Sequence, residues 1–131
     1  MKDSAKTTLI LSCLFMLLAI IIGAFGAHAL QPHMTEKGLA TFKTGSLYHL
    51  IHALGLLGLG LFQLNSRGPS EFNSVRWTML LGIIFFSFNC YLYAITHERI
   101  FAMIVPIGGT LFLISWSLFL YKIIGLSENK A

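Results

Sequence analysis

Five histidines are the residues of this 131-residue chain whose type and spacing could best support chemistry. His49 and His52 are three residues apart, so they would share one face of a helix. Together with His28 they could offer three nitrogens to a zinc or copper ion. No carboxylate or thiolate accompanies these histidines. The pattern therefore does not predict a metal site, and no cofactor is expected.

Catalysis by serine or cysteine has little support in the sequence. Ser115 and Ser117 lie in an apolar run in which no histidine or aspartate is close enough to activate a hydroxyl. The two cysteines, Cys13 and Cys90, also lie within apolar runs and form no CxxC motif. We therefore expect two free thiols packed as small hydrophobic residues, and we do not expect an enzyme.

The elements that carry these residues are four long apolar runs, at 9–30, 45–64, 77–96 and 100–121. Each run is 20 to 22 residues long, and about 20 apolar residues are enough for a helix to cross a bilayer. The chain is 56% hydrophobic and only 11% charged, which leaves too few polar side chains to cover a soluble protein of this size. The sequence predicts an all-α membrane protein, a single domain over residues 1–131 with four transmembrane helices and short loops.

Basic residues flank these runs singly and predict the orientation of the chain. Lys and Arg favour the cytoplasmic side of a membrane. With the N-terminus inside, six of the nine would face the cytoplasm and three would face outward. The six are Lys2, Lys6, Arg67, Arg76, Lys122 and Lys130, and the three are Lys37, Lys43 and Arg99. We therefore expect both termini to be cytoplasmic, and the scattered charges do not predict nucleic-acid binding.

One alternative concerns the N-terminal run, because Ala27, His28 and Ala29 resemble a signal-peptidase site. The apolar run before this site is longer than the core of about 7 to 15 residues that is usual in a signal peptide. We therefore expect the segment to remain as the first span.

Polar and helix-breaking residues gather at one depth in this topology. At about 1.5 Å of rise per residue, the members of this layer lie in the outer third of the membrane. Pro106 cannot donate a backbone hydrogen bond, so the last helix is expected to be kinked or partly unwound there. The predicted layer consists of His28, His49, His52, Tyr48, Asn89, Tyr91, Pro106, Gly108 and Gly109.

Two interpretations of this layer remain open. The polar groups either satisfy the carbonyl that the proline leaves free or line a small cavity that binds a ligand. Under both, His52 should meet Asn89 or Tyr91 on the third helix and Pro106 on the fourth. Small residues on the first helix, by contrast, predict close helix packing; they are Ala19, Gly23, Gly26 and Ala27.

Four motifs, in order along nearly the whole chain, resemble the YgdD-like family of small bacterial inner-membrane proteins. They are GAFGAHAL from Gly23, FKTGSLYHLIHAL from Phe42, FS…YLYA from Phe86 and PIGGTLFLISW from Pro106. The resemblance implies four helices and carries no established reaction, substrate or cofactor. Its pattern falls on Gly23, Gly26, His28, Gly45, Tyr48, His52, Ser87, Tyr91, Pro106, Gly108 and Gly109. The sequence departs from it at His49, Phe88, Asn89 and Val105.

The functional hypothesis that follows is a non-enzymatic component of the bacterial inner membrane. It would support envelope integrity by packing with membrane lipids, with a second copy or with a membrane protein partner. The alternative is a small transporter or channel subunit that uses the histidine-containing layer as a polar cavity.

Overall fold

The computed structural model describes residues 3–128, which form helices and turns and contain no strand. The first span is α1 (Asp3–Phe25) extended by η1 (Gly26–Leu30) and η2 (Gln31–His33), and the second is α2 (Glu36–Asn65). The third consists of η3 (Pro69–Phe72), α3 (Asn73–Ile83), η4 (Ile84–Phe88) and α4 (Asn89–Thr96), and the fourth is α5 (Arg99–Glu128). All four are long and apolar enough to cross a membrane, as the sequence predicts.

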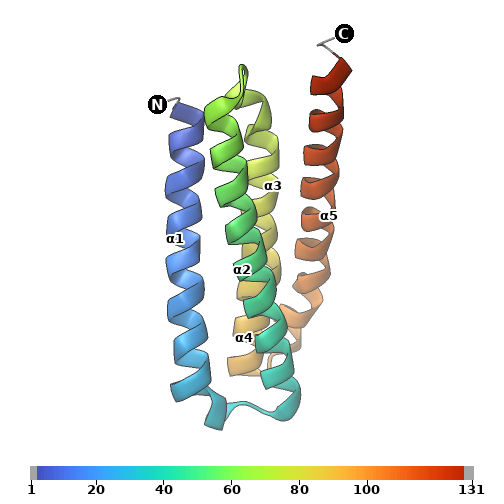
Figure 1. Cartoon of the computed structure of the whole chain (residues 1–131). Coiled ribbons are helices and arrows are strands. Elements are labelled where there is room, and N and C mark those ends of the chain that lie inside the picture. The colour runs from blue at the N-terminus through green and yellow to red at the C-terminus, as the bar shows by residue number, and fades with distance from the viewer. Residues whose placement is uncertain (1–2, 129–131) are drawn as a thin grey trace.

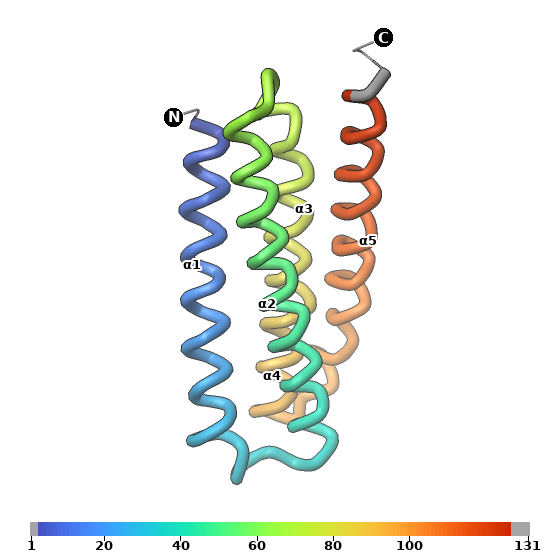
Figure 2. Tube along the Cα trace, viewed as in Figure 1, coloured from blue at the N-terminus to red at the C-terminus, as the bar shows by residue number. Residues whose placement is uncertain are grey.

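The spans run alternately up and down, so that the start of α1 and the end of α5 lie at the same end of the bundle (Figure 1). We call this the terminal end and the other the distal end. The second and third spans are central: α1 packs mainly against α2, and α5 packs mainly against α3, η4 and α4 (Figure 2). The first and fourth spans are therefore peripheral, and a smaller share of each is buried.

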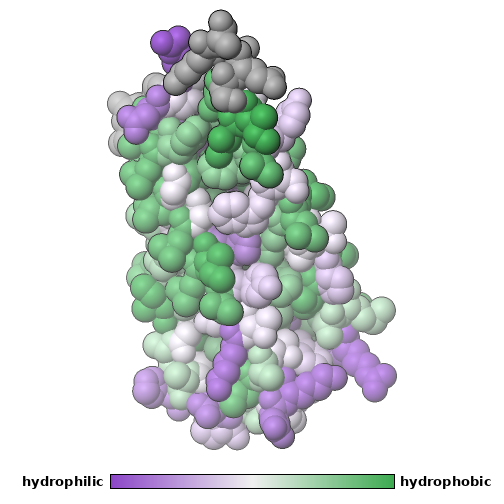
Figure 3. Space-filling view, turned by 45° about the vertical axis from the view of Figure 1, so that its right-hand side comes forward, coloured by the Kyte–Doolittle hydropathy of each residue, from purple (hydrophilic) through white to green (hydrophobic). Residues whose placement is uncertain are grey.

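Large apolar side chains hold the central spans together. The main core joins α2, the third span and α5, and it consists of Leu56, Leu59, Phe72, Val75, Met79, Leu80, Ile83 and Phe112. Apolar residues also cover most of the outside of the bundle, because lipid rather than water surrounds it. On the face drawn in Figure 3, hydrophilic residues gather toward the two ends, and most of the surface between them is hydrophobic. This distribution is that of a transmembrane bundle.

The helices extend beyond the predicted runs. α2 begins at Glu36, nine residues before the run at 45–64, because Thr35 caps it by accepting a hydrogen bond of 3.0 Å from the backbone N–H of Gly38. Leu39 and Phe42, which precede the predicted run, thus belong to the first part of a transmembrane helix. The link from α4 to α5 is short, as predicted, and His97 turns the chain there in a left-handed conformation with φ of 61°.

The irregular backbone is in a different place from the one that the sequence suggested. α5 continues through Pro106 from Arg99 to Glu128, so the predicted unwinding of the last helix is wrong. The π-helical turns lie instead in the third span, at η4, and at the end of the first span, at η1. Proline is tolerated within a transmembrane helix when small local adjustments absorb the missing hydrogen bond, and Pro106 lies on the exposed side of α5.

Candidate functional site

His52 is buried between α2 and α5, where both of its ring nitrogens are engaged. Nε2 lies 3.1 Å from the indole Nε1 of Trp116, and Nδ1 lies 2.7 Å from the backbone oxygen of Tyr48. The imidazole also stacks on Phe112, with 3.5 Å between the ring centroids. His52 therefore connects the second span to the fourth through Trp116, which the sequence analysis did not single out.

His49 points in another direction, toward the third span. Its Nδ1 lies 3.0 Å from the hydroxyl oxygen of Tyr91, and its ring contacts Phe15 and Phe88 edge-on. Its Nε2 is buried and makes no well-formed hydrogen bond, although the imidazole interacts with the backbone of Phe15. The hydroxyl of Ser87 is buried without a partner. The two histidines therefore make two separate pairs, His49 with Tyr91 and His52 with Trp116.

Asn89 and Pro106 do not join these pairs. The side-chain amide of Asn89 donates to the backbone oxygens of Ile84 and Phe85, at 3.2 and 3.0 Å. Asn89 therefore satisfies carbonyls of the π-helical turn in its own span. The expected cluster of His52 with Asn89 or Tyr91 and with Pro106 is not formed, because Tyr91 pairs with His49 and the ring nitrogens of His52 are bonded to Tyr48 and Trp116. Asn89 was expected to donate to a free carbonyl in the fourth helix. It instead stabilises the irregular turn of the third span.

At Gly108, α5 approaches the irregular turn closely. A Cβ atom on Gly108 would lie only 2.2 Å from the backbone nitrogen of Phe86, whereas one on Gly109 would lie 3.8 Å from the ring of Phe86. The ring of Tyr48 also packs here, with its centroid 4.7 Å from that of Phe86 and 6.0 Å from that of Phe112. Two residues of the predicted layer, Gly108 and Tyr48, therefore pack between the second, third and fourth spans.

On the first span, the tightest position is Gly26 rather than Gly23. A Cβ atom on Gly26 would lie 2.2 Å from the ring of Phe42, but one on Gly23 would make an ordinary contact of 3.6 Å with the hydroxyl of Ser46. Ala19 is fully buried, whereas Ala27 is exposed. The small residues therefore pack against α2 along part of their stripe only.

The three-nitrogen metal site has no geometric basis. His28 lies exposed in η1, away from the pairs that His49 and His52 form. Among residues 3–126, whose side chains the structure describes, no group of three or more His, Cys, Asp or Glu is placed to hold a metal ion. The cysteines are free, as expected, but only Cys90 is packed inside the bundle, since Cys13 is exposed.

A second polar cluster, at the terminal end, was missed by the sequence analysis. Arg76, which was counted only as a flanking charge, is 6% exposed, and its Nη1 donates to the backbone oxygen of Ser4 and the hydroxyl of Thr8, both at 3.2 Å. Thr8 also lies 2.5 Å from the side-chain oxygen of Gln63, and the amide of Gln63 donates to Ser4 and to the carbonyl of Pro69. We call Ser4, Thr8, Gln63 and Arg76 the terminal cluster.

The terminal cluster had a signal in the sequence. Ser4, Thr8 and Ser12 repeat every four residues, which places three hydroxyls on one face of a helix. In the structure this face meets α2, where Ser12 donates to the backbone oxygen of Ala53 at 3.0 Å, and α3, where Arg76 lies. The polar stripe on this apolar helix therefore indicated the face by which the first span packs against α2 and α3.

Four apolar spans with polar pairs between them and hydrophobic side chains outside define a multi-pass membrane protein. The family described as "Protein of unknown function (DUF423)" matches residues 22–109, and the chain belongs to this family. The resemblance to the YgdD-like family is thereby confirmed.

Relatives from distant bacteria match most of the chain. The UPF0382 membrane protein YwdK of Bacillus subtilis (strain 168) is 38% identical over 111 residues, which are 85% of this chain and 90% of that protein. The UPF0382 inner membrane protein YgdD of Escherichia coli (strain K12) is 32% identical over 126 residues, 96% of this chain and 95% of that protein. No solved structure is significantly similar to the chain.

Proposed function

We propose that the chain is a non-enzymatic component of the bacterial inner membrane and supports envelope integrity by packing with lipids or with a membrane protein partner. The observation that carries the proposal is the pairing of the buried polar groups. His49 with Tyr91 and His52 with Trp116 are pairs between spans, so their polar atoms bind helix to helix rather than face an empty site. Interhelical hydrogen bonds of this kind stabilise membrane bundles.

The outer surface supports the same proposal. The peripheral first and fourth spans present large apolar side chains along their length, such as Leu17 and Ile20 on α1 and Met103 and Leu113 on α5. These faces suit acyl chains or another transmembrane helix, because close packing and lipid contact drive association within a bilayer. The described chain has short connections and no separate soluble unit, so its contacts are made mainly within the membrane.

The test is a strain that lacks the gene, grown under detergent and osmotic stress and also on media that limit single solutes or metals. The proposal predicts general sensitivity to membrane stress, which the wild-type gene restores. A defect confined to one solute or metal, with normal resistance to membrane stress, would contradict it.

The second candidate, a small transporter or channel subunit, has one observation in its favour. The hydroxyl of Ser87 is buried without a hydrogen-bond partner, and Nε2 of His49 has only a weak contact with the backbone of Phe15. Such atoms often face a ligand or a transported species. A groove of about 430 Å³ beside His52 and Trp116 is lined mostly by apolar and aromatic residues, which fits a lipid chain better than an ion. The defect on a single solute described above is the result that would favour this candidate.

A further inference from the structure

Arg76 carries a positive charge that the protein buries but does not neutralise. Its hydrogen-bond partners are the backbone oxygen of Ser4 and the hydroxyl of Thr8, both neutral, and no carboxylate among residues 3–126, whose side chains the structure describes, forms an ion pair with it. A buried charge without a counter-ion is costly, and ionisable groups in membrane spans are usually paired. The missing partner of Arg76 must therefore be sought outside the described chain.

The free part of the guanidinium group shows what that partner would be. Nη1 makes both hydrogen bonds to protein, whereas Nε is buried without any partner and Nη2 donates no hydrogen bond within the described residues. Nε and Nη2 form the edge of arginine that binds two oxygens of a phosphate or carboxylate at once. The edge left without a protein acceptor is thus the one suited to an oxyanion.

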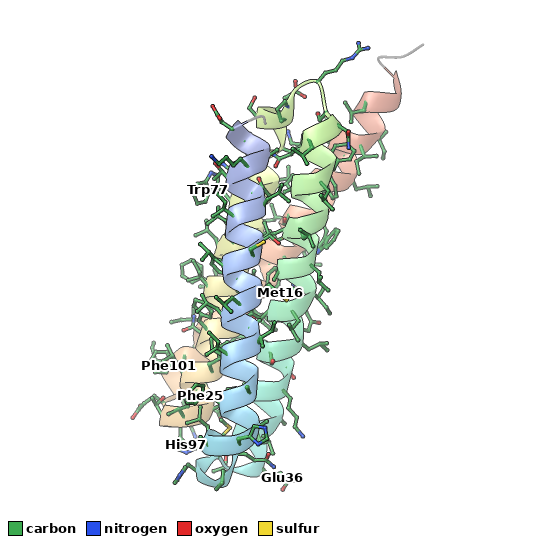
Figure 4. All side chains as sticks on the ribbon, turned by 60° about the vertical axis from the view of Figure 1, so that its left-hand side comes forward. Met16, Phe25, Glu36, Trp77, His97 and Phe101 are labelled. Atoms are coloured by element: carbon green, nitrogen blue, oxygen red, sulfur yellow. The ribbon has the colours of Figure 1, made fainter. Side chains whose placement is uncertain are left out.

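The position of Arg76 favours a lipid as the source of that oxyanion. Its guanidinium carbon lies 5.2 Å from the centre of the Trp77 ring, and Trp77 is 52% exposed. Tryptophan rings concentrate at the level of lipid headgroups. Figure 4 shows Trp77 beside the terminal end of α1, far from Phe25 and His97 at the distal end. Arg76 therefore lies where lipid phosphates are found.

An apolar path leads from this position toward the middle of the membrane. Trp77, Leu81 and Ile84 are spaced by four and three residues, so they lie on one side of the third span, and all three are exposed. An acyl chain could lie along this stripe while its phosphate met Arg76. A free phosphate ion would gain nothing from the stripe.

We propose that Arg76 and Trp77 form a binding site for an anionic phospholipid in the leaflet at the terminal end. The lipid phosphate would meet Nη2, and would reach the buried Nε when the side chains that cover it move aside. A zwitterionic lipid fits less well, because its ammonium group would oppose the guanidinium charge. The inference deepens the proposed function, on which it rests, by naming the class of lipid partner. The terminal cluster then has two roles, since it joins three spans and aims Arg76 at the lipid.

The experiment uses the purified full chain in detergent and measures its thermal unfolding midpoint with added phosphatidylglycerol, with phosphatidylcholine of the same acyl chains, and with inorganic phosphate. Native mass spectrometry with an equimolar mixture of the two lipids measures retention. We expect a larger rise of the midpoint with phosphatidylglycerol and about fivefold preferential retention of it, the ratio that ~1 kcal/mol per arginine near a charged surface implies. Equal effects of the two lipids, or the same rise with inorganic phosphate, would overturn the proposal.

Variants locate the site. Arg76→Gln, which removes the charge and replaces the guanidinium group with a shorter amide, should lose the preference for phosphatidylglycerol, whereas Arg67→Gln, at an exposed arginine in the loop of the same end, should keep it. Loss of the preference in both variants, or in neither, contradicts the assignment. If Arg76→Gln does not fold, Trp77→Leu decides: it leaves the hydrogen bonds of Arg76 in place and should reduce the preference. Lipid retention is measured without any phenotype, so its failure is distinct from failure of the envelope function.

Discussion

The indole nitrogen of Trp116 on α5 lies 3.1 Å from Nε2 of His52 on α2. An indole N–H can only donate, so Nε2 is the acceptor and the proton of the neutral imidazole is on Nδ1, facing the backbone oxygen of Tyr48. Both nitrogens of His52 are thereby used within the protein. His52, which the sequence suggested as a ligand-binding residue, therefore connects two helices.

A double-mutant cycle should measure this connection. His52→Phe and Trp116→Phe each remove one side of the hydrogen bond, and each should lower the free energy of unfolding by about 0.5–2 kcal/mol. The double variant should lose less than the sum, with a coupling of roughly 0.5–1.5 kcal/mol, as for other hydrogen bonds between membrane helices. Thermal or denaturant unfolding in detergent gives these values. Trp77→Phe is the control, and purely additive losses would show that the bond is not formed.

Gly108 and Gly109 are adjacent, yet they should respond oppositely to alanine. Gly108→Ala places a methyl group 2.2 Å from the backbone nitrogen of Phe86, and backbone cannot rotate away as a side chain can. We expect a loss on the order of 1–3 kcal/mol. Gly109→Ala meets only the Phe86 ring at 3.8 Å, so it should be neutral or slightly stabilising through better helix propensity. Equal melting temperatures for the two variants would refute the close approach of α5 to η4.

The first span offers a similar comparison, in which the expected loss of stability is smaller. Gly26→Ala directs a methyl group at the ring of Phe42, 2.2 Å away, whereas Gly23→Ala makes an ordinary contact of 3.6 Å with Ser46. Because a ring can shift, we expect Gly26→Ala to cost about 1 kcal/mol, at the lower end of the range for overpacking. Gly23→Ala should leave the unfolding midpoint unchanged. The reverse order would place the helix contact at Gly23, where the sequence alone put it.

The fold could be predicted from the sequence because membrane spans are governed by length and hydrophobicity alone. Runs of 20 to 22 apolar residues gave the number of helices correctly. The ends were less accurate, since α2 already begins at Glu36 and continues the helix through polar residues. Hydropathy does not detect the part of a helix that extends beyond the hydrocarbon core. The Thr35 cap, in contrast, marks where α2 begins.

The site could be predicted only in part, because depth along a helix says nothing about direction around it. His49, His52, Tyr91 and Asn89 share a depth, but they face different neighbours. Arg76 was misjudged in the other direction. Its sequence position at the edge of an apolar run suggested an exposed flanking charge, whereas it is buried and hydrogen-bonded to the first span. Such tertiary contacts depend on how the helices rotate about their axes, which the apolar runs do not specify.

The charge count makes a prediction about orientation that stays open. Both termini and the loop at Arg67 should face the cytoplasm, by six basic residues to three. Lys2 and Lys130, two of the six, lie outside the described residues. Single reporter cysteines at Ser70 and Lys37, with Cys13 and Cys90 replaced by alanine, would decide it in intact cells. Labelling from outside should occur at position 37 and not at 70, and the opposite pattern would invert the topology.

The most direct test of the central claim compares folding with function across variants of the buried polar pairs. His52→Phe, Trp116→Phe and Tyr91→Phe would be expressed in the deletion strain, with folded protein in the membrane and resistance to membrane stress measured together. If the polar groups hold helices together, resistance should fall in proportion to the amount of folded protein. A His52→Phe variant that folds as well as the wild type but restores no resistance would contradict the account, because His52 would then act on a ligand.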